Sequence, residues 1–239
     1  MLGRFHEIGL ATADIRASVE FYERLEFSQA PTGDTWAHPY GVLTDGRVFI
    51  GLHQRRSPAR SLTFVRPGVA EHVPLLRARG IEPAFVRVGD EVFNEAGFHD
   101  PAGHLVTLIE ARTYSPVDRG PESKSLCGYF VHLSLPATDF DAARSFWEPL
   151  GFVAGEECDS PYVHLPLTSD HLNLAFHRPR TFDDAMLVFR DPDMAGRIAR
   201  LREMGVPFLD DLPRGLDPKR NALIAAPEGT VLLLLEGDD

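Results

Sequence analysis

Histidine is the residue whose distribution in this chain first suggests chemistry. The sequence contains ten histidines, and five of them lie on strand-like runs: His53, His132, His164, His171 and His177. Imidazole and carboxylate side chains on neighbouring strands can bind a divalent metal on one side and leave positions open for a substrate on the other. For any single histidine a structural role is the commoner alternative, so the position in the fold must decide which of them matter.

Arginines follow two of these histidines. Three come after His53 and two after His177: Arg55, Arg56, Arg60, Arg178 and Arg180. A guanidinium pairs bidentately with a carboxylate or a phosphate, so these side chains could hold an anionic substrate. The commoner alternative is a solvated hairpin end in an acidic protein.

The composition limits the classes of function. The chain has 239 residues, of which 44% are hydrophobic and 25% charged, the balance of a globular protein with a sizeable core. Its formal net charge of −11 predicts a surface that repels nucleic acid and anionic membranes. Two cysteines without a CxxC motif argue against a disulfide framework or a zinc ribbon. Because there is no apolar signal core and no membrane-length apolar run, we expect a cytoplasmic protein.

A long internal repeat organises the chain. The segment from Asp14 to Phe27 reads DIRASVEFYERLEF, and it recurs 125 residues later as DFDAARSFWEPLGF, from Asp139 to Phe152. A strand-like run precedes each copy of this segment. A repeat at a fixed period indicates tandem structural units, so we expect two copies of one module.

Each copy is expected to contain two βαβββ half-units. In the first copy, alternation over residues 7–11 predicts a strand, and Asp14 is placed to cap the amphipathic helix that follows. Asp45-Gly46 then predicts a hairpin between two strand-like runs. The second half-unit is expected to hold a strand at 62–65, a helix at 69–79 that ends at Gly80, two weaker strands, and a last strand at 104–110.

The second copy follows the same order. We expect strands at 132–136, 162–167, 172–177, 186–189 and 231–236, and helices at 139–150 and 193–204. Residues 113–126 hold prolines, a glycine and several charges without periodicity, which is typical of a linker. The predicted domains are therefore a first module over residues 1–112, a linker over 113–126 and a second module over 127–239.

These segments resemble the signatures of the vicinal oxygen chelate superfamily, the group of glyoxalases, bleomycin-resistance proteins and extradiol dioxygenases. The opening signature of that family, a strand, an aspartate and a helix ending in aromatic residues, is similar to EIGLATADIRASVEFYERLEF and HLSLPATDFDAARSFWEPLGF. Its closing signature, Asp-Pro-x-Gly and an apolar strand, is similar to DPAGHLVTLIE and APEGTVLLLLE. The resemblance implies an α+β fold of tandem paired βαβββ modules, in which each sheet curls into a cup-shaped half-barrel with the helices outside.

The resemblance also implies a divalent metal, Fe, Mn, Ni or Zn, held in a cup by three side chains. The first ligand lies on the opening strand, seven residues before the capping aspartate, which corresponds to Glu7 and His132. His6 is one position off and is expected to face away, because strand side chains alternate. The last ligand is a glutamate four residues after the closing glycine, and Thr107 and Leu233 stand there instead. Both copies therefore lack the anionic ligand of the last strand.

The middle ligand falls on one of two positions in each copy, because the preceding loops differ in length. These positions are Ala59 or Ser61 in the first copy and Asp184 or Met186 in the second, and Asp184 is the one credible ligand among them. The candidate metal ligands are thus Glu7, His132 and Asp184, which make an incomplete site.

A site shared between paired modules, as found in the family, would also use the ends of the fourth strands. His53 and His177 occupy these equivalent ends. Such a site would combine His132 and His177 with Thr107, or Glu7 and His53 with Asp184. The candidate substrate-binding residues are therefore His53, His177, Thr107 and Leu233.

Two hypotheses for the function follow. The first is a small-molecule enzyme of the glyoxalase or dioxygenase type, a dioxygenase, lyase or isomerase, with a metal near His132 that polarises vicinal substrate oxygens. The second is a metal-free protein that binds a small molecule, such as a drug-sequestering resistance protein. The missing carboxylates favour the second hypothesis, whereas His132, Glu7 and Asp184 favour the first. Both predict a small-molecule partner without nucleic acid or membrane, and both a monomer and a homodimer stay open.

Overall fold

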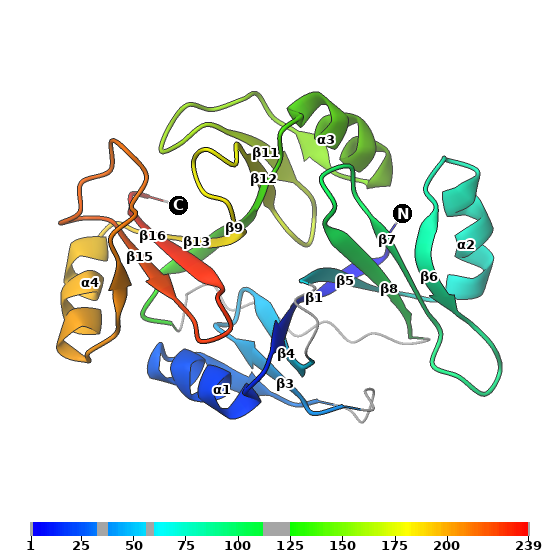
Figure 1. The fold of residues 1–239 in the computed structure, drawn as a ribbon, viewed down its shortest axis with the longest axis horizontal. Coiled ribbons are helices and arrows are strands. Elements are labelled where there is room, and N and C mark those ends of the chain that lie inside the picture. Colours follow the sequence, from blue (N-terminus) through cyan, green and yellow to red (C-terminus); the bar gives the residue numbers. More distant parts are fainter. Residues whose placement is uncertain (1, 33–37, 56–59, 112–124, 239) are drawn as a thin grey trace.

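The computed structural model describes residues 2–32, 38–55, 60–111 and 125–238, and it folds them into two sheets of eight strands each (Figure 1). The first sheet and its helices comprise β1 (Arg4–Thr12), α1 (Ile15–Arg24), β2 (Ser28–Ala30), β3 (Tyr40–Thr44), β4 (Phe49–Gln54), β5 (Ser61–Arg66), α2 (Val69–Arg77), β6 (Pro83–Arg87), β7 (Glu95–His99) and β8 (Leu105–Glu110).

The second sheet repeats this series. It comprises β9 (Tyr129–Pro136), α3 (Phe140–Trp147), the 3₁₀ turn η1 (Glu148–Leu150), β10 (Val153–Ala154), β11 (His164–Thr168), β12 (Leu174–His177), β13 (Met186–Asp191), α4 (Met194–Glu203), β14 (Phe208–Leu209), β15 (Ala222–Ala225) and β16 (Val231–Glu236). The predicted α+β fold with two tandem modules is confirmed.

The strand order shows how each module is assembled. The sheets run β2-β3-β4-β1-β5-β8-β7-β6 and β10-β11-β12-β9-β13-β16-β15-β14. The opening strands β1 and β5 pair antiparallel with each other, and each pairs in parallel with the last strand of its own half-unit, β4 or β8. Each sheet is therefore two βαβββ half-units joined through their opening strands. It is open at both edges, as a half-barrel is.

Local signals in the sequence place the helices. Asp14 Oδ1 accepts a hydrogen bond from the Ala17 N–H at 3.1 Å, which satisfies a free donor at the start of α1. Gly80 follows α2 with a φ of +77°, a left-handed conformation that a side chain would disfavour. Both roles were predicted from the residue types alone.

The connection between the modules lies almost entirely outside the described residues, which omit 112–124. The predicted boundaries at 112 and 127 stay predictions. None of the helices in the described part of the chain has the length and apolar character needed to cross a lipid bilayer.

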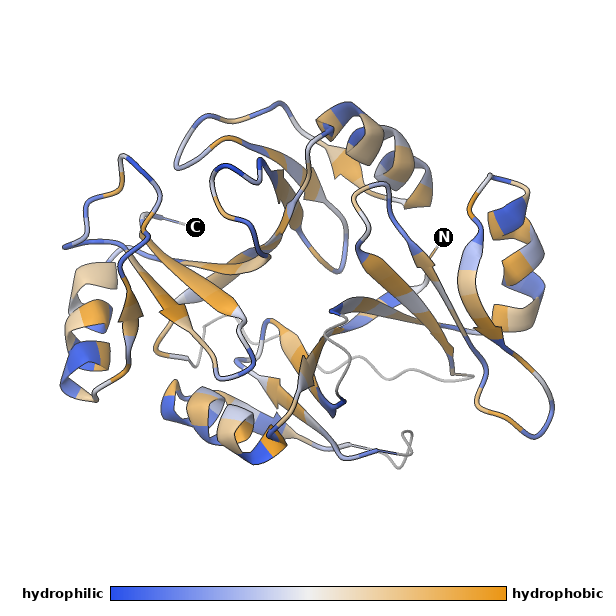
Figure 2. Ribbon diagram, in the orientation of Figure 1, coloured by the Kyte–Doolittle hydropathy of each residue, from blue (hydrophilic) through white to orange (hydrophobic). Residues whose placement is uncertain are grey.

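The two modules share one hydrophobic core. The Phe27 ring, just after α1, lies 6.3 Å from the Phe189 ring of β13, and the Phe98 ring of β7 lies 6.2 Å from the Phe146 ring of α3. A single cluster of buried apolar side chains extends through both modules. Figure 2 shows that the strands are mainly apolar, whereas polar residues gather in the loops and on parts of the helices. The shared core holds the two sheets against each other.

Candidate functional site

The first sheet presents a row of polar side chains on its cup face. Ile8 and Leu10 of β1 belong to the core, so Glu7, which alternates with them, faces the cup. Glu7 pairs with Thr63 of β5, and Thr63 pairs with Thr107 of β8. Glu7, Thr63 and Thr107, called here the first row, therefore lie side by side across three neighbouring strands.

The second sheet presents the equivalent row. His132 of β9 pairs with Val188 of β13, and Val188 pairs with Leu233 of β16. His132, Val188 and Leu233, called here the second row, therefore lie side by side across three neighbouring strands. Glu7 with Thr107, and His132 with Leu233, are the pairs that counting along the sequence selected, and strand pairing puts each pair in one row.

The middle position of each row differs from the prediction. Thr63 and Val188 occupy it, each two residues beyond the later of the two positions that counting allowed, Ser61 and Met186. Asp184 instead precedes β13, where its side chain is 62% exposed and its Oδ1 lies 3.3 Å from Arg60 Nη1. Ala59, one of the alternatives, lies outside the described residues. The reason is that the pairing with the opening strand sets this register, and a count along a loop does not reveal that pairing.

The donor atoms of the two rows do not fit the three-ligand metal site that the resemblance implies. The first row offers one carboxylate and two hydroxyls, and the second offers one imidazole and two aliphatic side chains. Tight sites for these metals use three or more imidazole, thiolate or carboxylate ligands. Within the described part of the chain, no group of three or more His, Cys, Asp and Glu residues is placed to hold a metal ion.

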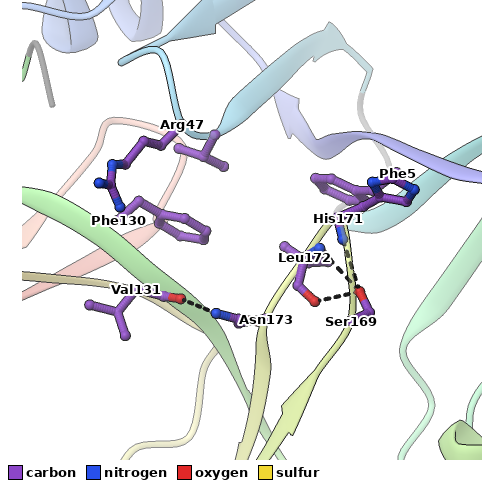
Figure 3. Close-up of a pocket in the computed structure, with 9 residues that line it drawn as sticks. Phe5, Arg47, Phe130, Val131, Ser169, His171, Leu172 and Asn173 are labelled. Atoms are coloured by element: carbon purple, nitrogen blue, oxygen red, sulfur yellow. Dashed lines mark hydrogen bonds between the residues drawn. The ribbon is translucent and has the colours of Figure 1, made fainter. Parts of the chain in front are cut away.

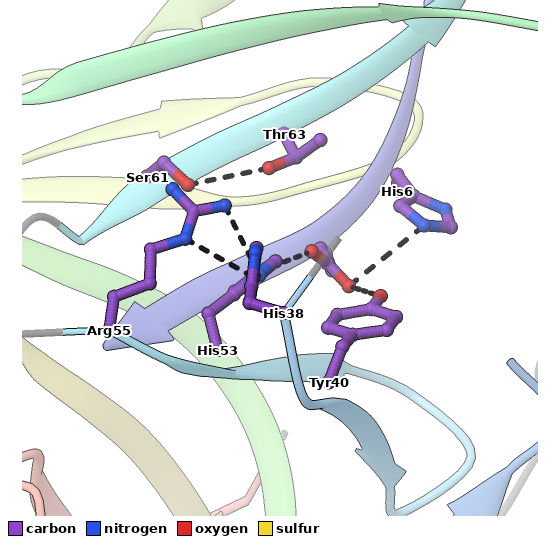
Figure 4. A network of polar contacts seen from close by, with 8 residues as sticks. His6, His38, Tyr40, His53, Arg55, Ser61 and Thr63 are labelled. Atoms are coloured by element: carbon purple, nitrogen blue, oxygen red, sulfur yellow. Dashed lines mark hydrogen bonds and ion pairs between the residues drawn. The ribbon is translucent and has the colours of Figure 1, made fainter. Parts of the chain in front are cut away.

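Glu7 is a fully buried carboxylate at the centre of a polar network (Figure 4). The Tyr40 hydroxyl donates a hydrogen bond to Oε2, and His53 Nε2 lies 3.1 Å from Oε1. His6, expected to face away, has its Nε2 only 3.9 Å from Oε2, and the register of β1 against β5 shifts between Phe5 and Glu7 at this point. These partners offset the cost of burying a carboxylate.

His53 extends this network towards the surface. A carboxylate only accepts hydrogen bonds, so the His53 Nε2 beside Glu7 carries a proton. His53 Nδ1 lies 3.0 Å from His38 Nε2, and Arg55 Nε donates to that His38 nitrogen at 3.2 Å. Burial, followed by the charge of Arg55, lowers the pKa of His38. The first cup therefore holds a carboxylate and two imidazoles whose polar atoms lie in a continuous line of close contacts.

A small cavity lies beside His53. It has a volume of about 50 Å³ and is lined by Ala11, His53, Arg55, Ser61, Thr63, Phe85, Glu95, Leu105 and Thr107. Phe85 of β6 forms part of the wall of this cavity. A Cβ atom at Gly97 of β7 would lie 2.2 Å from the Phe85 ring, so the ring packs directly against β7. The first cup is thus polar but narrow.

The second cup is packed with apolar side chains. A buried cluster contains Tyr162, Met186, Val188, Leu223, Val231, Leu233 and Leu235, and Phe182, Leu212 and Leu216 pack against it. His132 Nε2 lies 3.2 Å from the Tyr162 hydroxyl, and its ring stacks on His164 at 5.9 Å. Burial lowers the pKa of His132 to about 3, so its ring is neutral. Leu233 and His132 therefore belong to a packed interior.

His177 also has structural partners. Its Nε2 lies 3.0 Å from the Phe182 carbonyl oxygen, so this nitrogen donates, and its Nδ1 accepts from the Ser134 hydroxyl at 2.8 Å. Burial lowers its pKa to about 4. Two shared sites were considered from the sequence. The structure brings Glu7 and His53 of one of them together. The other would combine Thr107 with His132, but Thr107 lies in the first row and His132 in the second.

The fold is similar to that of solved enzyme structures over nearly the whole chain. A 2,2',3-trihydroxybiphenyl 1,2-dioxygenase from Sphingomonas wittichii strain RW1 has a TM-score of 0.64 at 15% identity, covering 99% of this chain and 91% of that chain. A Mn(II)-bound glyoxalase from Novosphingobium aromaticivorans has a TM-score of 0.59 at 18% identity, covering 98% and 81%. A catechol 2,3-dioxygenase has a TM-score of 0.62 at 19% identity, covering 98% and 87%.

This chain has the vicinal oxygen chelate fold. The strand order, the two paired modules and the similarity to these structures agree on it. No protein-family model matches the chain, and no curated protein matches its sequence. Because the vicinal oxygen chelate fold supports more than one activity, the reaction has to be argued from the site.

Two residues of this site were not among those predicted from the sequence. They are Tyr40, which donates to Glu7, and Thr63, which pairs with it. The predicted hairpin around Asp45-Gly46 could have revealed Tyr40, because Tyr40 on one strand of that hairpin pairs directly with His53 on the other. Gly51 was a second available signal, since a glycine inside a strand often marks the close approach of another group.

Proposed function

We propose that the protein is a small-molecule enzyme that works in the first cup and transfers a proton with the Glu7–His53 pair. The observation that carries the proposal is the buried Glu7 carboxylate, hydrogen-bonded to a histidine that itself lines a cavity. A carboxylate that orients an imidazole and stabilises its protonated form is a recurring arrangement for general base catalysis. The similar solved structures named above are enzymes, which supports an enzymatic role.

The reaction class follows from the other residues that line the cavity. Removal of a proton from a carbon next to a carbonyl leaves an enolate, whose oxygen carries negative charge. Arg55, Ser61, Thr63 and Thr107 line the same cavity as His53 and can donate hydrogen bonds to that oxygen. Return of the proton to another carbon gives an isomerase, and departure of a leaving group gives a lyase.

The proposed reaction makes no use of a bound metal. The metal-dependent alternative centred on His132 is not supported by its surroundings, because Val188 and Leu233 occupy the other two positions of its row. A dioxygenase of the kind found with this fold would need a redox-active metal, for which neither row supplies the ligands.

A second candidate function is a metal-free binding protein, such as one that sequesters a drug. The side chains of the two rows favour this candidate, because neither row supplies the three ligands that a metal-dependent enzyme needs. The two candidates differ in whether a bound molecule exchanges a proton.

Proton exchange distinguishes them. The protein would be incubated in D₂O with a panel of small ketones, 2-hydroxy ketones and 2-oxo acids, and deuterium incorporation would be followed by proton NMR. We expect exchange with at least one compound, about 100-fold slower in His53→Gln. The matched control is His177→Gln, the equivalent position in the second module, with thermal melting to verify that both variants fold.

Two results would contradict the proposal. Exchange at an equal rate in His53→Gln would remove His53 as the base, and tight binding without exchange across the panel would favour the binding protein. Elemental analysis after incubation with Fe²⁺, Mn²⁺, Ni²⁺ and Zn²⁺ addresses the metal. About one metal retained per chain and lost in His132→Ala would restore the metal-dependent hypothesis.

A further inference from the structure

A second cavity lies between the two modules and shares no lining residue with the first cup (Figure 3). It has a volume of about 330 Å³, within the range of small-molecule sites. Three pairs of lining residues are equivalent in the repeat, each pair 125 residues apart: Phe5 with Phe130, Arg47 with Leu172, and Val48 with Asn173. The same structural elements of both modules therefore meet here. This cavity is called here the inter-module pocket.

Two phenylalanine rings form the apolar part of the inter-module pocket. Phe5 makes an edge contact with Phe64 at 5.5 Å, and Phe130 makes an edge contact with Phe189 at 5.6 Å. Both partners belong to the opening strand of the second half-unit of their own module. The two rings are thus anchored in the same way on either side, and they offer aromatic surface to a ligand between them.

The hairpin turns of both modules frame the polar part. Asp45 Oδ1 accepts from the backbone N–H groups of Arg47 and Val48 at 2.8 and 2.9 Å, which fixes the backbone of this turn. Ser169 Oγ accepts from the Leu172 N–H at 3.1 Å in the equivalent turn. These bonds hold the turn backbones and so hold Arg47 at the pocket.

The guanidinium of Arg47 provides a fixed positive charge. Its Cζ lies 4.6 Å from the centre of the Tyr129 ring, a cation–π contact that orients the group. The repeat places Leu172 at the equivalent position, so this strong charge is contributed by one module only. Ser169, His171 and Asn173 add polar groups from the other module.

We propose that the inter-module pocket binds a small aromatic anion, with its ring between Phe5 and Phe130 and its carboxylate or sulfonate at Arg47. None of the described residues that line the pocket is an aspartate or glutamate, although the chain has 35 of them. An acidic protein of net charge −11 repels anions at long range, so a local cation and aromatic contacts must supply the recognition. This site is independent of the proposed reaction in the first cup.

Binding of 1-naphthoate, measured by titration calorimetry, tests the proposal. We expect one molecule bound per chain, with affinity about tenfold lower in Arg47→Met, because a charge-assisted hydrogen bond is lost. The neutral analogue 1-naphthalenemethanol should bind about tenfold more weakly to the unaltered protein and should not distinguish Arg47→Met from it. Asn173→Leu is a second variant at the opposite side of the pocket, where we expect a smaller loss.

Two controls separate this site from others. Arg16→Met removes an 87% exposed guanidinium on α1 and should leave naphthoate affinity unchanged. His53→Gln alters only the first cup and should also leave it unchanged. The proposal is overturned if naphthoate does not bind, if Arg47→Met binds it as tightly as the unaltered protein, or if His53→Gln abolishes binding. Thermal melting of each variant verifies that the fold persists.

Discussion

The Tyr22 hydroxyl donates a hydrogen bond to Glu228 at 2.8 Å, joining the first helix of one module to the closing turn of the other. The repeat reproduces this contact in the opposite direction. Trp147, which occupies the position of Tyr22 in the second copy, donates its indole N–H to Asp100 Oδ2 at 3.2 Å. The aromatic residue and its acidic partner differ between the copies, but the contact is the same. These two bonds tie the modules together on both sides of their shared core.

The Tyr22–Glu228 bond should contribute measurably to stability. Because Tyr22 is fully buried, Tyr22→Phe leaves a carboxylate without one of its donors, and we expect a loss of about 1–3 kcal/mol in the free energy of unfolding. Urea denaturation of Tyr22→Phe, Glu228→Gln and the double variant measures the coupling. Glu203→Gln, an exposed change on α4, serves as the control. Strictly additive losses in the double variant would show that the bond carries no coupling.

Gly51 should be required for the position of Glu7. A Cβ atom at Gly51 would lie 2.3 Å from the Glu7 carboxyl carbon, whereas at Gly41 on the neighbouring strand the nearest atom would be 3.9 Å away. We therefore expect Gly51→Ala to lose about 1–3 kcal/mol of stability and the activity of the first cup, and Gly41→Ala to keep both. Urea denaturation and the proton-exchange assay measure the two effects. Full exchange activity in Gly51→Ala would place the chemistry away from Glu7.

Phe85 should limit the size of ligand that the first cup accepts. Its ring lies against Gly97 and lines the small cavity, so Phe85→Ala should enlarge that cavity and allow bulkier compounds to bind. Val86→Ala on the same strand is the control, because neighbouring strand residues face opposite sides and Val86 does not line the cavity. The measurement is the affinity for a series of compounds of increasing size. An identical size limit in both variants would mean that another group closes the cup.

Acid should destabilise the protein partly through His132. Its pKa is about 3 in the folded protein, because burial disfavours the charged ring, and about 6.5 when unfolded. Below pH 6.5 the unfolded chain therefore binds a proton that the folded chain does not. Stability falls as the pH decreases towards 3, by about 1.4 kcal/mol per pH unit for this residue.

Replacement of His132 tests this dependence. His132→Leu should flatten the decline in unfolding free energy between pH 6.5 and 4, measured by urea denaturation at several pH values. His99→Leu, a change of an exposed side chain, should leave the decline unaltered. If the unfolding free energy of His132→Leu has the same pH dependence as that of the unaltered protein, the His132 ring gains its proton over the same pH range in the folded and unfolded states.

Much of the fold could be predicted from residues close together in the chain. The repeat, the cap at Asp14, the hairpin at Asp45-Gly46 and the glycine at Gly80 are set by local conformational preferences, which the residue types reveal directly. The opening positions Glu7 and His132 and the closing positions Thr107 and Leu233 were found by counting, because each is a short fixed distance from such a signal.

Only the tertiary structure decided how these positions are used. The pairing of β5 with β1 and of β13 with β9 placed Thr63 and Val188 in the rows and left Asp184 at the surface, since strand register depends on partners distant in sequence. Leu212 and Leu216 help to fill the second cup, and Tyr40 and His53 complete the first. The chain thus encodes two similar modules locally, whereas long-range packing makes one cup polar and the other an apolar core.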